Sequence, residues 1–219
     1  MLLAMVPPKL AAETTADEAS AEETSGDDVS VEDQIIDAAL ALTRTRPWSE
    51  VILSDVAQVA GVTLADLHMF FDSKKSILNA FSRRTDVAVL RAVDPEDQEG
   101  ESPKDRLFDV LMLRFDELQK DKPAAMAIAR HFAGDPFGLL AGVKPALRAM
   151  HWRLEAAAID GGGIKGAVRA RALGVVWLAT FRVWLDDGDD MSKTMAELDR
   201  RLQQSVALWG GDKAVSEEA

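Results

Sequence analysis

The sequence predicts an all-α protein with two helical modules. After residue 30, apolar residues recur at the three- and four-residue spacing of amphipathic helices, and no segment alternates as a strand does. Between residues 53 and 78, two short helical patterns flank a glycine, which is typical of a helix-turn-helix. The 219 residues are 47% hydrophobic, enough for a three-helix N-terminal module and a larger C-terminal bundle.

The first segment, residues 1–30, is predicted to be a disordered acidic tail. Residues 1–34 contain nine acids and one lysine and show no apolar period, so they bury too little surface to offset chain entropy. A short C-terminal tail is expected over residues 211–219. The N-terminal tail is interpreted as a solubilising segment. A sharper hypothesis is that it competes with DNA for the basic residues of the next module.

The helix-turn-helix module is predicted over residues 31–80. Ser30 is expected to cap its first helix, and Trp48 to fill its core. Gly61 stands where a chain leaving a helix needs a positive φ, which costs glycine little. Thr63 is placed to cap the next helix, whose inner face includes Leu67.

The second module is predicted over residues 81–210. A long helix from Ser73 to about Val93 joins it to the first module, and a polar loop over residues 94–100 follows. Later helices are expected over about residues 103–118, 121–132, 145–159, 164–185 and 191–209. Glycine and proline at 134–136 are expected to separate the second from the third of these. Asp189 and Asp190 are expected to favour the start of the last helix electrostatically.

The stretch from Ile35 to about Phe81 resembles the signature of tetracycline-repressor (TetR) type regulators. The matching positions are Ile36, Ala38, Ala39, Leu40, Trp48, Val56, Ala57, Ala60, Gly61, Val62, Thr63, Leu67, Phe70, Phe71, Ser73, Lys74 and Leu78. The resemblance implies a ligand-responsive transcriptional regulator, a repressor. It also implies that the first module binds a double-stranded DNA operator, that the second binds a small hydrophobic effector, and that the two C-terminal helices form a homodimer. A cytoplasmic location is expected because the sequence shows no membrane span and no secretory signal pattern.

The resemblance places DNA contacts on the third helix and at the start of the fourth. The candidate DNA-binding residues are Thr63, Leu64, Ala65, Asp66, His68, Met69, Ser73, Lys74 and Lys75. Sequence readout generally uses Arg, Lys, Asn and Gln, whereas the outermost residues here are Ala65, Asp66 and Met69. Residues 49–85 hold four acids and four bases, so attraction to phosphate is expected to be weak.

That weakness keeps a second interpretation open. Residues 47–50 resemble those of the lipid-binding accessory proteins of ubiquinone biosynthesis, which share the architecture without acting on DNA. The alternative is therefore a protein of the same fold that has lost DNA binding. It would bind a lipid or quinone-like ligand, or a protein partner.

An apolar ligand site is expected in the second module. Its candidate residues are Met126, His131, Phe132, Met150, His151, Trp152, Trp177 and Phe181. Walls rich in Met and Trp suit a hydrophobic or aromatic molecule. Arg153 and Arg182 are candidates for an anionic head group, but surface pairs with acids such as Glu155 and Asp186 are the favoured interpretation.

Enzymatic, cofactor, metal and membrane functions are not expected. No nucleophile, base and orienting group form a recognisable motif. Residues 161–166 have the spacing of a dinucleotide-binding glycine loop, but a helix rather than a strand precedes them. There are no cysteines and only three histidines to bind a metal, and no run of eighteen apolar residues forms a membrane span.

Overall fold

A computed structural model describes residues 30–96, 98–133 and 136–210 of the chain, and every regular element in these ranges is a helix. The predicted tails, apart from Ser30, lie outside the described residues. The N-terminal elements are α1 (Val31–Thr43), the short 3-10 helix η1 (Trp48–Glu50), α2 (Leu53–Ala60), α3 (Leu64–Phe70) and α4 (Lys74–Ala92). The others are α5 (Pro103–Lys120), α6 (Lys122–Ala133), α7 (Pro136–Ala156), α8 (Gly163–Leu185), α9 (Ser192–Gln204) and α10 (Val206–Trp209). The predicted all-α fold is confirmed.

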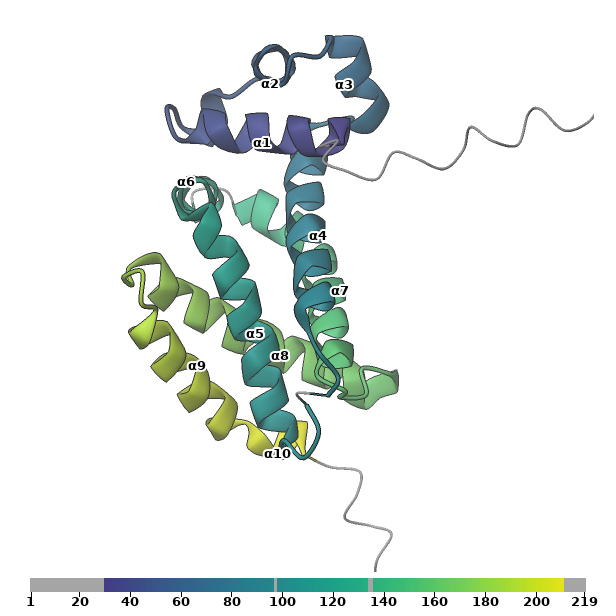
Figure 1. Ribbon diagram of the computed structural model, residues 1–219, viewed down its shortest axis with the longest axis vertical. Helices are drawn as coiled ribbons and strands as arrows, with labels where there is room; N and C mark the ends of the chain where they lie inside the picture. Colours follow the sequence, from purple (N-terminus) through teal and green to yellow (C-terminus); the bar gives the residue numbers. More distant parts are fainter. Residues whose placement is uncertain (1–29, 97, 134–135, 211–219) are drawn as a thin grey trace, which may run out of the picture.

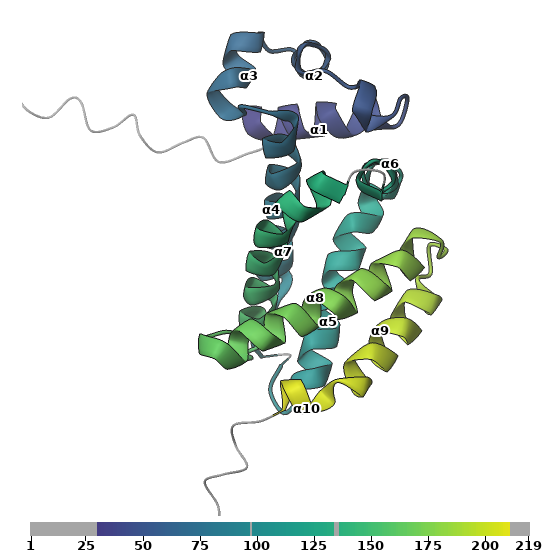
Figure 2. The same ribbon diagram turned by 180° about the vertical axis from the view of Figure 1, so that it is seen from behind.

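The helices form a small module that sits on one end of a larger bundle (Figure 1). Helices α1, α2 and α3 form the module, and α4 runs from it down the length of the bundle. From behind, α8 crosses α5, with α7 and α9 on either side (Figure 2). In the part of the chain that the structure describes, no helix is long and apolar enough to cross a lipid bilayer.

The module folds around the residues that the sequence pattern selects. Ser30 caps α1 by accepting a hydrogen bond from the Asp33 amide at 3.1 Å. Trp48 is buried in the module core, as predicted. Gly61 ends α2 in the left-handed conformation, with φ at 71°. These contacts fix the angle at which α3 leaves the turn.

Two helices of the bundle hold the module in place. Arg84 of α4 donates to Asp33 at 3.2 Å and to Asp37 at 2.7 Å, both on α1. Ala124 of α6 is fully buried in the module core. Arg44, just after α1, pairs with Asp121 at 3.1 Å, where α5 ends. The module therefore rests on both α4 and α6.

Helix α7 corrects the predicted start of the third bundle helix. The sequence analysis placed this start near Pro145, but α7 begins at Pro136 and contains Pro145. A proline fits the first turn of a helix, where its missing N–H is not needed. An interior proline costs about 3 kcal/mol of helix stability. Burial of Met150 and Leu154 from the same helix in the bundle core offsets this cost.

The predicted last helix is divided at Ser205 into α9 and α10. The Ser205 hydroxyl donates to the Arg201 carbonyl at 2.7 Å, and the Trp209 indole donates to the Leu202 carbonyl at 3.1 Å. This bend brings Trp209 into the core. At the other end of α9, Asp187 accepts bonds from the amide and hydroxyl of Thr194, while Asp190 accepts from the Ser192 amide.

The connection between α7 and α8 lies directly against the first turns of α8. A Cβ atom placed on Gly166 would lie 1.8 Å from the Gly161 carbonyl oxygen. Only a glycine at position 166 leaves room for this approach. Gly161 and Gly166, which have the spacing of a nucleotide-binding loop, therefore allow the loop before α8 to pack against the first turns of α8.

Candidate nucleic-acid interface and ligand site

Helix α3 begins with a capping box. The Thr63 hydroxyl accepts a bond from the Asp66 amide at 3.1 Å, and the Asp66 carboxylate accepts from the Thr63 amide at 3.1 Å and from its hydroxyl at 2.6 Å. The bonds from Thr63 lower the pKa of Asp66, which stays ionised at neutral pH. Asp66 therefore has a structural role that its charge alone does not reveal.

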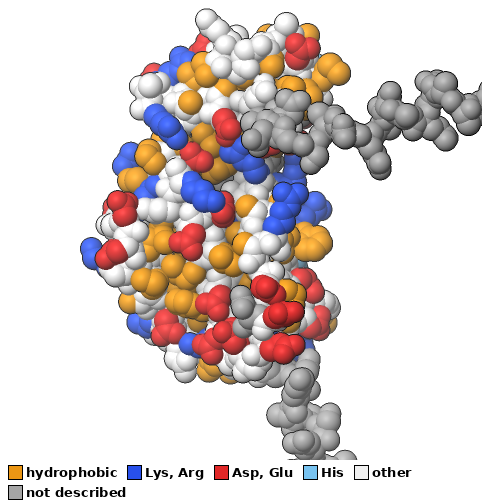
Figure 3. All heavy atoms as spheres, viewed as in Figure 1, with side chains coloured by type: hydrophobic (Ala, Val, Ile, Leu, Met, Phe, Trp, Pro, Cys, Tyr) orange, Lys and Arg blue, Asp and Glu red, His pale blue; other side chains and the backbone are white. Residues whose placement is uncertain are grey.

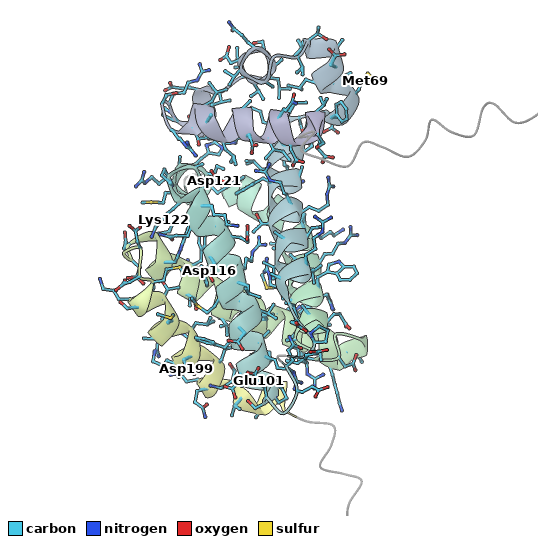
Figure 4. The ribbon with its side chains drawn as sticks, viewed as in Figure 1. Met69, Glu101, Asp116, Asp121, Lys122 and Asp199 are labelled. Carbon is cyan, nitrogen blue, oxygen red and sulfur yellow. The ribbon has the colours of Figure 1, made fainter. Side chains whose placement is uncertain are left out.

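The outer surface of α3 is mainly apolar. Leu64, Phe70 and Ile52, which precedes α2, are about half exposed, and Met69 is 82% exposed. Met69 points away from the body of the molecule (Figure 4). Thr63, Ala65, Asp66 and His68 are also exposed. A shallow depression beside this surface is lined by Ile52, Leu53, Ser54, Leu64, Leu67, His68 and Phe71.

The residues at the start of α4 make contacts within the protein. Ser73 is half-buried and accepts a bond from the Ser76 amide at 3.2 Å, capping α4. Lys74 donates to the Trp48 carbonyl at 2.6 Å, and its ammonium lies 4.8 Å from the centre of the Trp48 ring. Burial lowers the pKa of Lys74. The Lys75 side chain is exposed.

The Lys74→Ala variant is expected to lose about 2 kcal/mol of unfolding free energy, because a charge-assisted hydrogen bond and a cation–π contact disappear. Urea denaturation without DNA measures this effect. Arg91→Ala, an exposed change on the same helix, is the control and should stay within about 0.5 kcal/mol of the parent. Equal losses in the two variants would contradict the role given to Lys74.

The candidate ligand-binding residues fall into three groups. Met126, His131 and Phe132 are half-buried on α6. His151 and Trp152 lie on α7, where Trp152 is 56% exposed and His151 approaches Gly161. Met150, Trp177 and Phe181 belong to the buried side of the bundle. The structure thus does not bring the predicted set together in one place.

An aromatic cluster runs through the bundle from Trp177. The Phe115 and Trp177 rings stack at 4.5 Å, Trp177 and Phe181 at 5.9 Å, and Phe181 and Trp184 at 5.3 Å between centroids. The Trp184 indole donates to the Gln119 side-chain oxygen at 2.9 Å. Trp177 connects two of the three hydrophobic clusters of the described structure.

Two buried arginines lie next to this aromatic cluster. Arg114 of α5 and Arg153 of α7 both bond to the same oxygen of Asp86 on α4, Arg153 at 3.1 Å. Their guanidinium carbons lie 5.4 Å and 4.8 Å from the centre of the Trp177 ring. Arg114 also donates to the Ser82 hydroxyl at 3.1 Å.

The interpretation of Arg153 as a surface residue is wrong, because its side chain is only 5% exposed. Its partner is Asp86 rather than Glu155, and only Arg182 is exposed as expected. Burial and the positive charge of Arg153 lower the pKa of Arg114 to about 9, while Asp86 opposes the shift. Arg114 therefore remains charged at neutral pH.

Sequence reasoning missed Arg114 and Asp86. A signal was present for Arg114, which stands between Leu111 and Leu118 at helical spacing on a buried stripe. The described residues contain no group of three or more His, Cys, Asp or Glu that would hold a metal ion.

Most of the solved structures with a similar fold are TetR-family transcriptional regulators. A TetR transcriptional regulator from Nitrosomonas europaea superposes with a TM-score of 0.67 at 21% identity, covering 81% of this chain and 99% of the other. A TetR regulator from Rhodococcus sp. RHA1 gives 0.59 at 19% identity, covering 80% and 94%. The Thermus thermophilus repressor FadR, solved with lauroyl-CoA, gives 0.56 at 15% identity, covering 86% and 100%. No protein-family model and no curated protein sequence matches the chain.

Proposed function

We propose that this chain, which has the fold of TetR-type transcriptional regulators, is a ligand-responsive, DNA-binding regulator that acts as a repressor. The observation that carries the proposal is the exposed helix α3, held by a capped turn on a module that α4 connects to the bundle (Figure 1). Such a helix fits the major groove of DNA.

The proposed DNA contacts are mainly apolar and non-ionic. Leu64, Ala65 and Met69 are placed to touch thymine methyl groups, whereas the Thr63 hydroxyl already donates its hydrogen to Asp66. On the face shown in Figure 3, acidic side chains gather at the end of the bundle far from the module, while Lys and Arg lie nearer to it. This distribution favours DNA at the module end.

A homodimer is proposed because α8 exposes an apolar stripe. Ile164, Val168, Val175 and Leu178 recur at helical spacing and are 48% to 86% exposed, and Trp152 of α7 is also exposed. A stripe of this kind is typical of a protein interface. The exposed face of α9 is largely polar, with Lys193, Asp199 and Arg200. Of the two C-terminal helices predicted to pair, α8 therefore supplies the apolar surface.

Fluorescence anisotropy tests DNA binding directly. The purified protein is titrated with its own upstream DNA and with a scrambled duplex of equal length, at two salt concentrations. Tighter binding to the upstream duplex, with weakening as salt rises, is the expected result. Equal binding to both duplexes, or none at low salt, would contradict the proposed function.

The Asp66→Asn variant is expected to bind DNA about fivefold more tightly at low salt, because it removes one negative charge that repels a nearby phosphate. Asparagine keeps the side-chain oxygen that accepts from the Thr63 amide. Asp199→Asn is the control, since Asp199 lies at the opposite end of the molecule (Figure 4). The same gain in both variants, or no gain from Asp66→Asn, would argue against α3 facing DNA.

A second candidate function rests on the same surface. Ile52, Leu64, Met69 and Phe70 form an exposed apolar surface on the module, which also suits a protein partner. In that case the chain shares the fold of TetR-type regulators but acts without binding DNA. The anisotropy experiment separates the two functions, because only the regulator prefers its own upstream duplex.

A further inference from the structure

The contact among Asp86, Arg114 and Arg153 buries more positive than negative charge. The Arg114 side chain is 7% exposed, that of Arg153 is 5% exposed, and that of Asp86 is 20% exposed. Asp86 is the only carboxylate of the described residues that acts on either guanidinium. The other groups that contact the arginines, the Ser82 hydroxyl and the Met150 sulfur, are neutral. One positive charge therefore lacks a counter-charge.

The two guanidinium groups also have unused donors. The Nε–H groups of Arg114 and Arg153 are buried and have no acceptor among the described residues. Burying a charge without a full set of partners is costly, so such a group is expected to have a further role. A second carboxylate would supply both the missing negative charge and oxygen acceptors, because guanidinium groups match carboxylate geometry.

We propose that Arg114 and Arg153 recognise the carboxylate of an anionic effector whose apolar body packs against the aromatic cluster at Trp177. This inference rests on the proposed function of a ligand-responsive regulator, and it names the class of effector. The cluster is the apolar surface next to the two guanidinium groups, which lie 5.4 Å and 4.8 Å from the centre of the Trp177 ring, and Phe115 and Phe181 extend this surface. The neutral amide of the same molecule would leave the buried positive charge unpaired.

The position of Asp86 gives the effector a way to reach the DNA-binding module. Asp86 is on α4, which connects directly to α3, whereas its two partners are on α5 and α7. The effector carboxylate supplies the missing negative charge and takes part of the hydrogen bonding of the two guanidinium groups, so their bonds to Asp86 weaken. With these bonds weakened, α4 is held less firmly against the bundle, and the module at its end can change position (Figure 1).

The test compares 2-naphthoate with its neutral counterpart 2-naphthamide on the full-length protein without DNA. Binding is followed by thermal shift and by the fluorescence of the tryptophans. Naphthoate is expected to bind at least about tenfold more tightly than naphthamide, and Arg153→Met to weaken naphthoate binding by a similar factor. Arg182→Met, a change at an exposed arginine of α8, is the control and should leave binding unchanged.

The Asp86→Asn variant provides a result that a purely structural role would not give. Because the competing carboxylate is removed, naphthoate is expected to bind this variant about tenfold more tightly than the parent. Equal binding of naphthoate and naphthamide, no binding of naphthoate, or weaker binding by Asp86→Asn would overturn the inference. If Asp86→Asn does not fold, Arg114→Met replaces it, with weaker naphthoate binding expected and unchanged binding contradicting the inference.

The two proposals fail in different ways. Naphthoate binding without any preference for the upstream duplex would contradict the proposed function alone. Preference for the upstream duplex without discrimination between naphthoate and naphthamide would contradict this inference alone.

Discussion

The Asp86→Asn variant is expected to lose about 3 kcal/mol or more of unfolding free energy, because it leaves two buried guanidinium groups without a counter-charge. Asp86 connects α4 to α5 and α7 through Arg114 and Arg153. The loss is measured by urea denaturation at neutral pH, where both arginines are charged.

The matched control is Arg153→Met, which removes the excess positive charge and fills similar space with an apolar side chain. Replacing a buried charge in this way is often neutral or stabilising. Arg153→Met is therefore expected to unfold at the same urea concentration as the parent or at a higher one. A large loss in Arg153→Met together with a small loss in Asp86→Asn would contradict the charge balance described for this cluster.

The double variant Val175→Glu, Leu178→Glu is expected to convert the proposed dimer into monomers. Burial of one such side chain is worth about 1.5–3 kcal/mol, so losing both contacts raises the dissociation constant by about 100-fold or more. Four charges then face each other across a two-fold interface. Analytical ultracentrifugation measures the change, and DNA binding is expected to fall with it because a monomer presents only one copy of α3.

Ala196→Glu serves as the control because it adds a charge to the exposed face of α9, away from the apolar stripe. It should leave the dissociation constant unchanged. A parent protein that is monomeric at the concentrations used for DNA binding would contradict the proposed dimer. Dissociation caused by Ala196→Glu alone would instead place the interface on α9.

The module could be predicted because its determinants are local. Gly61 ends α2 with a positive φ, Thr63 caps α3, and Trp48 is buried, as the sequence indicated. The end of α2 and the cap of α3 depend on residues a few positions away, so one segment is enough to recognise them. The capping box at Asp66 also had a local signal, a threonine three residues before an acid. It was missed because Asp66 was interpreted only by its charge.

The arginine cluster could not be predicted in the same way because its contacts are far apart in the sequence. Asp86 is 28 residues from Arg114 and 67 residues from Arg153. Neither pairing leaves a pattern in one segment, and an arginine is usually exposed. The start of α7 was misplaced for a similar reason, since local rules place Pro145 in the first turn of a helix and only packing in the bundle offsets the cost of an interior proline. The assignment of DNA-contacting residues on α3 stays a prediction.

The close contact between Gly166 and the Gly161 carbonyl has a consequence for how this chain can vary. At position 166 even the smallest side chain would collide with backbone rather than with a movable side chain. A saturation library should therefore show almost no tolerated replacement there, while neighbouring Ile164, which is 86% exposed, accepts many polar residues unless it lies in the dimer interface. The substitutions tolerated at these two positions therefore show, without a binding assay, whether a second subunit buries the Ile164 side of α8 in the functional protein.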